Sequence, residues 1–151
     1  MDAHAAKSVR PSLTLKRRIK APPERVFAAW SEAAHLSRWF CPADCTLETV
    51  EIDVRPGGAY RIGMRGIKSG ELHCVIGRYR TVEPPHRLVF SWAWYTTPER
   101  ESLVTVDIAA DGAGSVLTLT HENFADAPTR DRHQAGWTET LDRLVSLLDT
   151  H

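Results

Sequence analysis

The stretch TRDRHQAGWTETLDRLVSLL, residues 129–148, decides the fold of this chain. Its large apolar residues recur at intervals of three and four, which places them on one face of a helix. Those residues are Trp137, Leu141, Leu144, Val145 and Leu148. A helix of this kind has to bury its apolar face against another layer of structure. The rest of the chain must therefore supply a surface that covers it.

Most of the chain before this helix has the pattern of β-strands. Leu13, Leu15, Arg17 and Ile19 alternate with polar residues, as in a half-buried strand. Turn signals rich in Gly and Pro, such as RPGG at 55–58, separate the later runs. Gly77 predicts a bulge inside one of them. The further strands are expected near 46–54, 59–64, 70–82, 88–95, 102–109 and 115–121.

Two short helices are predicted between the first strand and the others, over 21–30 and 31–40. Pro22 and Pro23 suit the first positions of a helix, and Ser31 is a candidate N-cap for the second one. The order of elements indicates an α+β protein. We expect a curved antiparallel sheet of six to seven strands that wraps the C-terminal helix and leaves a gap near one end. Residues 1–11 are expected to be flexible, and residues 12–151 to form a single domain.

The bulk composition excludes several classes of protein. Lys and Arg number 19, as do Asp and Glu, so the net charge is zero and no basic stripe for nucleic acid is expected. The sequence contains no run of about 18 apolar residues, so no membrane span is expected. The N-terminus lacks the apolar core of a secretory signal. We therefore expect a cytoplasmic protein whose three cysteines are reduced thiols.

Five motifs occur in order along the chain. They are R-x-I-x-A-P from Arg17, RWF-x-P from Arg38, D-x-R-P-G-G-x-Y-R from Asp53, G-x-Y-x-x-V-x-P-P-x-R-L from Gly77, and H-x-x-G-W-x-x-x-L-x-x-L from His133. Together they make the chain resemble the START-like or SRPBCC superfamily, which has the helix-grip fold. The branch it resembles is named after the activator of the heat-shock chaperone Hsp90 ATPase.

The resemblance implies a cavity between the sheet and the C-terminal helix. Members of the superfamily use this cavity for lipids, steroids, polyketides or other apolar molecules, and some members are cyclases or hydrolases. The eukaryotic activator also has an N-terminal domain that contacts the chaperone, and we expect no counterpart of that domain here. A fold shared by so many ligands does not by itself define a function.

The segment CPADC, from Cys41 to Cys45, has three possible interpretations. A zinc site needs about four ligands, and no second pair of ligands lies nearby in the sequence. A redox motif would have the spacing C-x-x-C and would open a helix. These cysteines lie where a helix ends and a strand begins, which favours a structural corner. We therefore expect no metal and no cofactor, and Trp39 and Phe40 as the useful residues of this region.

Two polar residues are candidates for orienting a ligand. Arg17 lies at an inward position of its strand, where it needs an anionic ligand or an internal partner such as Glu122 or Asp53. His121 continues the alternation of Leu117 and Leu119, so it is either an anchor in the cavity or a satisfied imidazole at the end of a strand.

The leading hypothesis is a non-catalytic module that binds a small hydrophobic or amphipathic molecule. Two alternatives remain: a co-chaperone-like domain with a chaperone as partner, and a cyclase or hydrolase that uses His121 as a general base. The sequence leaves a monomer and a homodimer open. The candidate ligand-binding residues are Arg17, Trp39, Phe40, Tyr60, Ile62, Met64, Trp92, Trp94, Val104, Val106, His121, Trp137 and Leu141.

Overall fold

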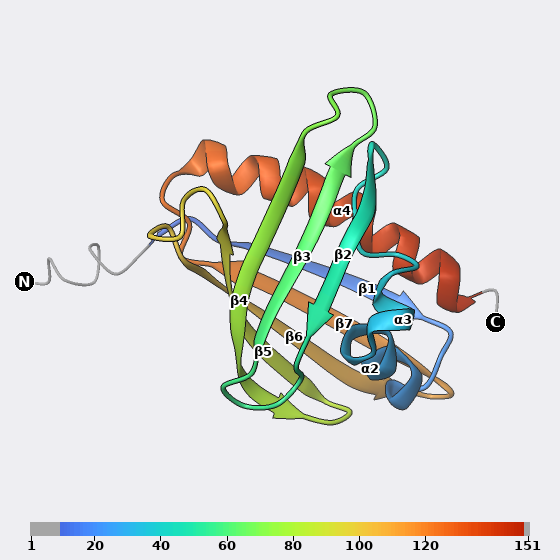
Figure 1. Ribbon diagram of the computed structural model, residues 1–151. Helices are drawn as coiled ribbons and strands as arrows, with labels where there is room; N and C mark the ends of the chain where they lie inside the picture. Colours follow the sequence, from blue (N-terminus) through green and yellow to red (C-terminus); the bar gives the residue numbers. More distant parts are fainter. Residues whose placement is uncertain (1–9, 150–151) are drawn as a thin grey trace, which may run out of the picture.

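A computed structural model describes residues 10–149 and has the predicted α+β architecture. Seven antiparallel strands form one sheet in the order β1-β7-β6-β5-β4-β3-β2, and the long helix α4 crosses it (Figure 1). The elements are β1 (Leu13–Ile19), α2 (Pro23–Ser31), α3 (Ala33–Leu36), β2 (Cys45–Ile52), β3 (Ala59–Gly66), β4 (Leu72–Glu83), β5 (Arg87–Trp94), β6 (Ser102–Asp111), β7 (Gly114–Glu122) and α4 (Ala127–Asp149).

The two helices after the first strand are confirmed, although the second is shorter than predicted, and Ser31 ends α2 while Glu32 is the N-cap of α3. Pro22 precedes α2 and Pro23 begins it. The first residue of a helix has no partner for its N–H within the helix, so a proline there loses no hydrogen bond. Helix α2 packs on β6 and β7, and α3 on β2, so the two helices cover one end of the interior. The expectation for residues 1–9 lies outside the described residues.

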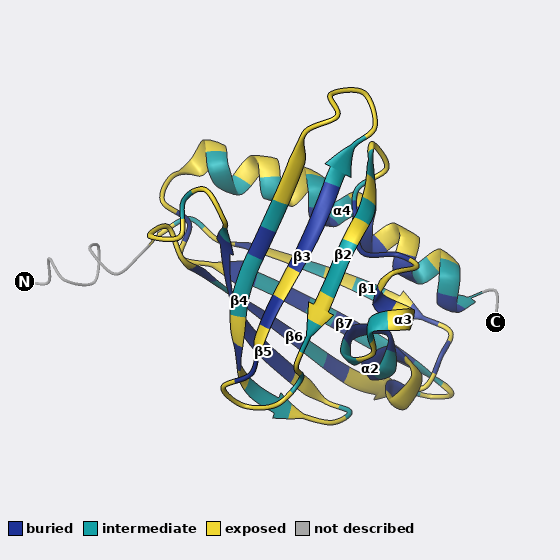
Figure 2. Ribbon diagram, viewed as in Figure 1, coloured by how far each residue is buried: buried dark blue, intermediate teal, exposed yellow. Residues whose placement is uncertain are grey.

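The sheet buries alternate residues on the side that faces the helices (Figure 2). Leu117, Leu119 and His121 of β7 are each 0% exposed, as the alternation predicted. On β1 the inward positions include Leu13 and Arg17, and their neighbours face water. Helix α4 places Trp137, Leu141, Leu144 and Leu148 in the same core.

Gly77 does not form the predicted bulge. The register between β4 and β5 shifts later, between Tyr79 and Thr81. A Cβ atom on Gly77 would lie 2.0 Å from the carbonyl oxygen of Ser91 and 2.5 Å from the ring of Tyr60. The glycine therefore allows Tyr60 to lie flat across β4 and donate a hydrogen bond of 2.6 Å to the Ser91 carbonyl.

Candidate functional site

A cavity of about 450 Å³ lies between the sheet and the first half of α4. This volume is in the range of small-molecule sites. Its wall comes from three parts of the chain. Helix α4 contributes Arg132, His133, Gly136, Trp137 and Thr140. The sheet contributes Met64, His73, Trp92 and Trp94. The segment after α3 contributes Phe40, Cys41, Pro42, Asp44 and Cys45.

One stripe of α4 faces this cavity. His133, Gly136, Trp137 and Thr140 are spaced by three, one and three residues, so they lie along one side of the helix. Asp126 starts the helix by accepting a hydrogen bond of 2.8 Å from the Thr129 N–H. Hydrogen bonding from the Thr129 side chain, and then from this N–H, lowers the pKa of the Asp126 carboxyl. A Cβ atom on Gly136 would meet Pro42 Cγ at 3.7 Å, an ordinary contact, so this glycine leaves room for the cavity itself.

Two groups in the core hold His121, one at each ring nitrogen. The indole N–H of Trp137 donates to Nδ1 over 3.0 Å, and the other ring nitrogen lies 2.7 Å from the Ser102 hydroxyl. An indole can only donate, so Nδ1 carries no proton. Nε2–H therefore donates to Ser102, whose hydroxyl donates to the carbonyl of Trp92. Burial, and then the neighbouring His133, hold the pKa of His121 well below its ordinary value of 6.5.

The Ser102–His121 contact is not a nucleophile with its base. A general base must have a free lone pair on the nitrogen that faces the hydroxyl. Trp137 fixes the opposite tautomer, in which Nε2 already holds a proton. This geometry favours the satisfied-imidazole interpretation of His121 and gives the hydrolase alternative no support at this residue.

His133 forms a second Trp–His pair at the cavity wall. Its Nδ1–H donates to the Thr129 carbonyl over 2.8 Å, and its Nε2 accepts from the Trp94 indole N–H over 3.1 Å. Burial lowers its pKa. The ring centroids of His121 and His133 are 5.4 Å apart, so two neutral imidazoles in opposite tautomers lie beside the tryptophans.

The segment CPADC is a corner of the cavity mouth. The Cys41 thiol donates to the Cys45 carbonyl over 3.2 Å, and Arg143 donates to the Cys41 carbonyl over 2.9 Å. Burial and the adjacent Asp44 raise the pKa of the Cys45 thiol to about 11, so it stays protonated at neutral pH. Within residues 10–149 no three His, Cys, Asp or Glu side chains gather to hold a metal ion.

The cavity brings together five of the thirteen residues predicted for the ligand site: Phe40, Met64, Trp92, Trp94 and Trp137. His121 lies directly behind Trp137, and its ring nitrogens are already paired. The other seven lie elsewhere in the core or at its edge. They are Arg17, Trp39, Tyr60, Ile62, Val104, Val106 and Leu141.

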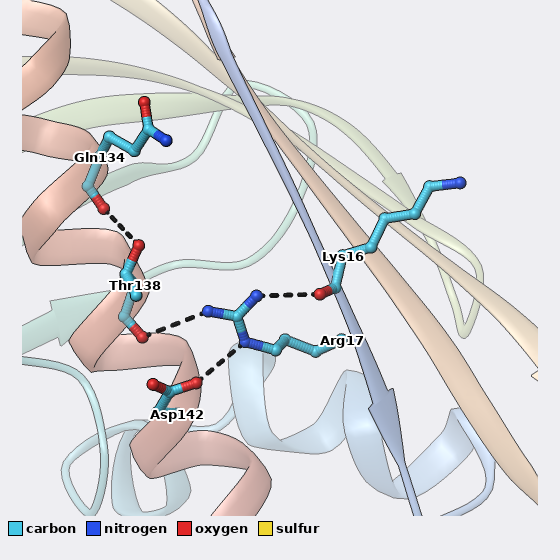
Figure 3. A network of polar contacts seen from close by, with 5 residues as sticks. All are labelled: Lys16, Arg17, Gln134, Thr138 and Asp142. Carbon is cyan, nitrogen blue, oxygen red and sulfur yellow. Dashed lines mark hydrogen bonds and ion pairs between the residues drawn. The ribbon is translucent and has the colours of Figure 1, made fainter.

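Arg17 has a different partner from those expected. Its Nε donates to Asp142 of α4 over 3.0 Å, and its guanidinium also reaches the backbone carbonyls of Lys16 and Thr138 (Figure 3). Glu122 and Asp53 are not its partners. An ion pair was the right kind of contact, but it is not internal, because the Asp142 side chain is 65% exposed, and its acid comes from a helix 125 positions away in the sequence.

Several lining residues are absent from the set of candidate ligand-binding residues. The sequence indicates that His133 could border the cavity and that Gly136 allows a close approach to a bound molecule, but neither they nor Thr140 are among the candidates, although they form a helical stripe with Trp137. That spacing is the signal that would have found them. Cys41, Cys45, Asp44 and His73 enter the wall only through the folding of the loop and hairpin around the mouth.

The fold and the cavity define a class, the helix-grip proteins of the START-like or SRPBCC superfamily. The chain belongs to the Activator of Hsp90 ATPase homolog 1-like protein family, whose model matches residues 20–149. No helix among the described residues is long and apolar enough to cross a membrane.

Solved structures of similar proteins share this fold. A protein from Chromobacterium violaceum is 28% identical, with a TM-score of 0.84 over 93% of this chain and 99% of its own. The AHSA1 protein of Silicibacter pomeroyi is 29% identical, with a TM-score of 0.82 over 91% and 97%. An AHSA1-like protein from Aeromonas hydrophila, 23% identical over 88% of each chain, has a TM-score of 0.74 and supports the fold alone. No curated protein matches the chain significantly.

Proposed function

We propose that this protein binds a small apolar or amphipathic molecule in the cavity beside α4, without catalysing a reaction on it. The observation that carries the proposal is the contrast between two parts of one aromatic interior. A void of only about 10 Å³ lies among Trp30, Phe40, Tyr60 and Phe90, whereas about 450 Å³ lies beside Trp92, Trp94 and Trp137. A core of this size normally closes its voids, so an open aromatic wall supports ligand binding.

The wall is suited to a flat, largely uncharged molecule. The rings of Trp92 and Trp137 are in contact at a tilt of 49°, with centroids 5.3 Å apart, and Met64 adds a flexible apolar surface. The charged members of the wall, Asp44 and Arg132, are exposed. They suit a polar end of the ligand at the mouth. The chaperone alternative draws its support from the family name alone, and we do not propose it.

The test uses N-phenyl-1-naphthylamine, a neutral apolar dye that fluoresces when it leaves water. We expect the protein to bind this dye with a saturable increase in fluorescence. In Gly136→Leu the new Cβ atom contacts Pro42 and the rest of the side chain extends into the cavity. Because it occupies the space of the dye, this variant should abolish the fluorescence increase. Ala135→Leu adds the same side chain at the next residue, which faces water, and should leave binding unchanged.

Thermal melting of both variants shows that they are folded. A dye signal that survives in folded Gly136→Leu, or that is absent from the original protein, would overturn the proposal.

A further inference from the structure

The buried part of the cavity wall has hydrogen-bond donors without acceptors. Thr140 is only 4% exposed, it lines the cavity, and its hydroxyl pairs with none of the described residues. Trp92 is 6% exposed, and its buried indole N–H has no partner among those residues. The Thr140 hydroxyl is not one of the described side-chain atoms that are fully buried without a partner, so it is accessible from the cavity that Thr140 lines, where a ligand can pair with it.

The acceptors on the same side of the cavity are already used. Nε2 of His133 accepts from Trp94, and Nδ1 of His121 accepts from Trp137. The Cys41 thiol donates to the Cys45 carbonyl. An indole N–H can only donate, and a hydroxyl can donate as well as accept. Among these described residues the Thr140 hydroxyl therefore remains to pair with a ligand, whereas the Trp92 N–H is itself buried.

The inner wall also has no charge to pair with an ion. Thr140, Phe40 and Trp137 are neutral, and the two histidines are neutral because burial lowers their pKa. A carboxylate or an ammonium group at this depth would be buried without a counter-ion, at a high cost in free energy. Arg132 and Asp44 also line the cavity, but both are exposed, so water screens their charges.

We infer that the ligand is a flat, apolar molecule with an uncharged carbonyl oxygen, such as an aromatic ketone or a quinone, and that this oxygen accepts a hydrogen bond from Thr140. The inference rests on the proposed function and specifies the chemical class of the ligand. Between His133 and Thr140 the helix rises about 10 Å, which is long enough for two or three fused rings. The aromatic wall contacts the rings, and the Thr140 hydroxyl selects the oxygen.

The experiment compares fluorene with 9-fluorenone, which have the same ring system and differ by one carbonyl oxygen. Each competes with N-phenyl-1-naphthylamine for the protein. Fluorene is the more hydrophobic of the two, so burial alone would favour it. We expect 9-fluorenone to bind about 2- to 10-fold more tightly instead, the gain of one hydrogen bond.

Thr140→Val keeps the shape of the side chain and removes the hydroxyl. It should abolish the preference for 9-fluorenone and leave the affinity for fluorene unchanged. Thr138→Val is the matched control. The Thr138 hydroxyl already donates to the Gln134 carbonyl over 2.7 Å on another side of the helix, so the preference should survive in this variant.

The outcomes separate the two proposals. Equal binding of both compounds, or a preference that persists in Thr140→Val, would overturn the carbonyl inference while the cavity remains a binding site. Failure of the dye and of both compounds to bind would instead remove the proposed function.

Discussion

The interior of this protein has two ends that are built from the same kind of residue but packed differently. The closed end, under α2 and α3, consists of Trp30, Trp39, Tyr60 and Phe90. The open end, under the first half of α4, consists of Trp92, Trp94, His133 and Trp137. Trp30 and Trp39 pack with ring centroids 4.7 Å apart, and the closed end contains almost no free volume. The open end retains about 450 Å³.

The difference comes from what covers each end. Helix α2 brings Trp30 to the closed end, and the segment after α3 brings Trp39, whose indole donates to the Ala29 carbonyl of α2 over 3.1 Å. At the open end α4 places Gly136 and Thr140 where large apolar residues would fill the space. Aromatic content therefore does not define a binding site, because the small residues opposite the aromatic wall decide whether a cavity remains.

The largest expected effect is on the closed end. Trp39 is 0% exposed, so Trp39→Ala should remove about 3–5 kcal/mol from the free energy of unfolding. Trp94 is only half-buried and borders the cavity, so Trp94→Ala should cost about 1–2 kcal/mol. Water can reach the His133 nitrogen that Trp94 leaves behind. Urea unfolding measures both values, and equal losses would show that the two ends do not differ in packing.

How far the sequence predicts this contrast depends on the kind of contact. Periodicity predicted the strands, the helices and the inward direction of His121, because these depend on neighbours along one element. It did not show that Trp39 is more deeply buried than Trp94, because both lie in short segments rich in aromatic residues. Their different burial depends on where α2, α3 and α4 lie over the sheet, and this is a property of the tertiary fold.

The second prediction is that acid weakens the open end first. Burial lowers the pKa of His121 and of His133, so the unfolded chain binds these protons more readily than the folded protein. Their contribution to stability is complete above the ordinary pKa of 6.5 and is lost as the pH falls from there toward the lowered values. The slope should reach about 1.4 kcal/mol per pH unit for each histidine.

The closed end should not respond over the same range. Its one ionisable group is the phenol of Tyr60, and the ring of Tyr79 packs against it with centroids 5.6 Å apart. Burial raises the pKa of both phenols, so they remain neutral in acid and at neutral pH. Urea unfolding between pH 7 and pH 5 measures the slope. His133→Gln should reduce it. A slope that is unchanged in His133→Gln would show that this imidazole is not held neutral by the fold.

The smallest expected effect concerns the ion pair that fixes α4 to the sheet beyond the cavity. Arg17 of β1 and Asp142 of α4 have side chains 21% and 65% exposed, so water screens their attraction. Asp142→Ala and Arg17→Leu, combined in a double-mutant cycle, should give a coupling of about 0.2–1 kcal/mol. The sequence predicted an inward Arg17 but not this partner, because nothing in a local pattern relates two positions so far apart.

If the pair also holds α4 at the height that keeps the cavity open, Asp142→Ala should weaken N-phenyl-1-naphthylamine binding more than its small loss of stability would explain. Unchanged dye affinity would show that Gly136 and Thr140 keep the open end empty without help from this contact.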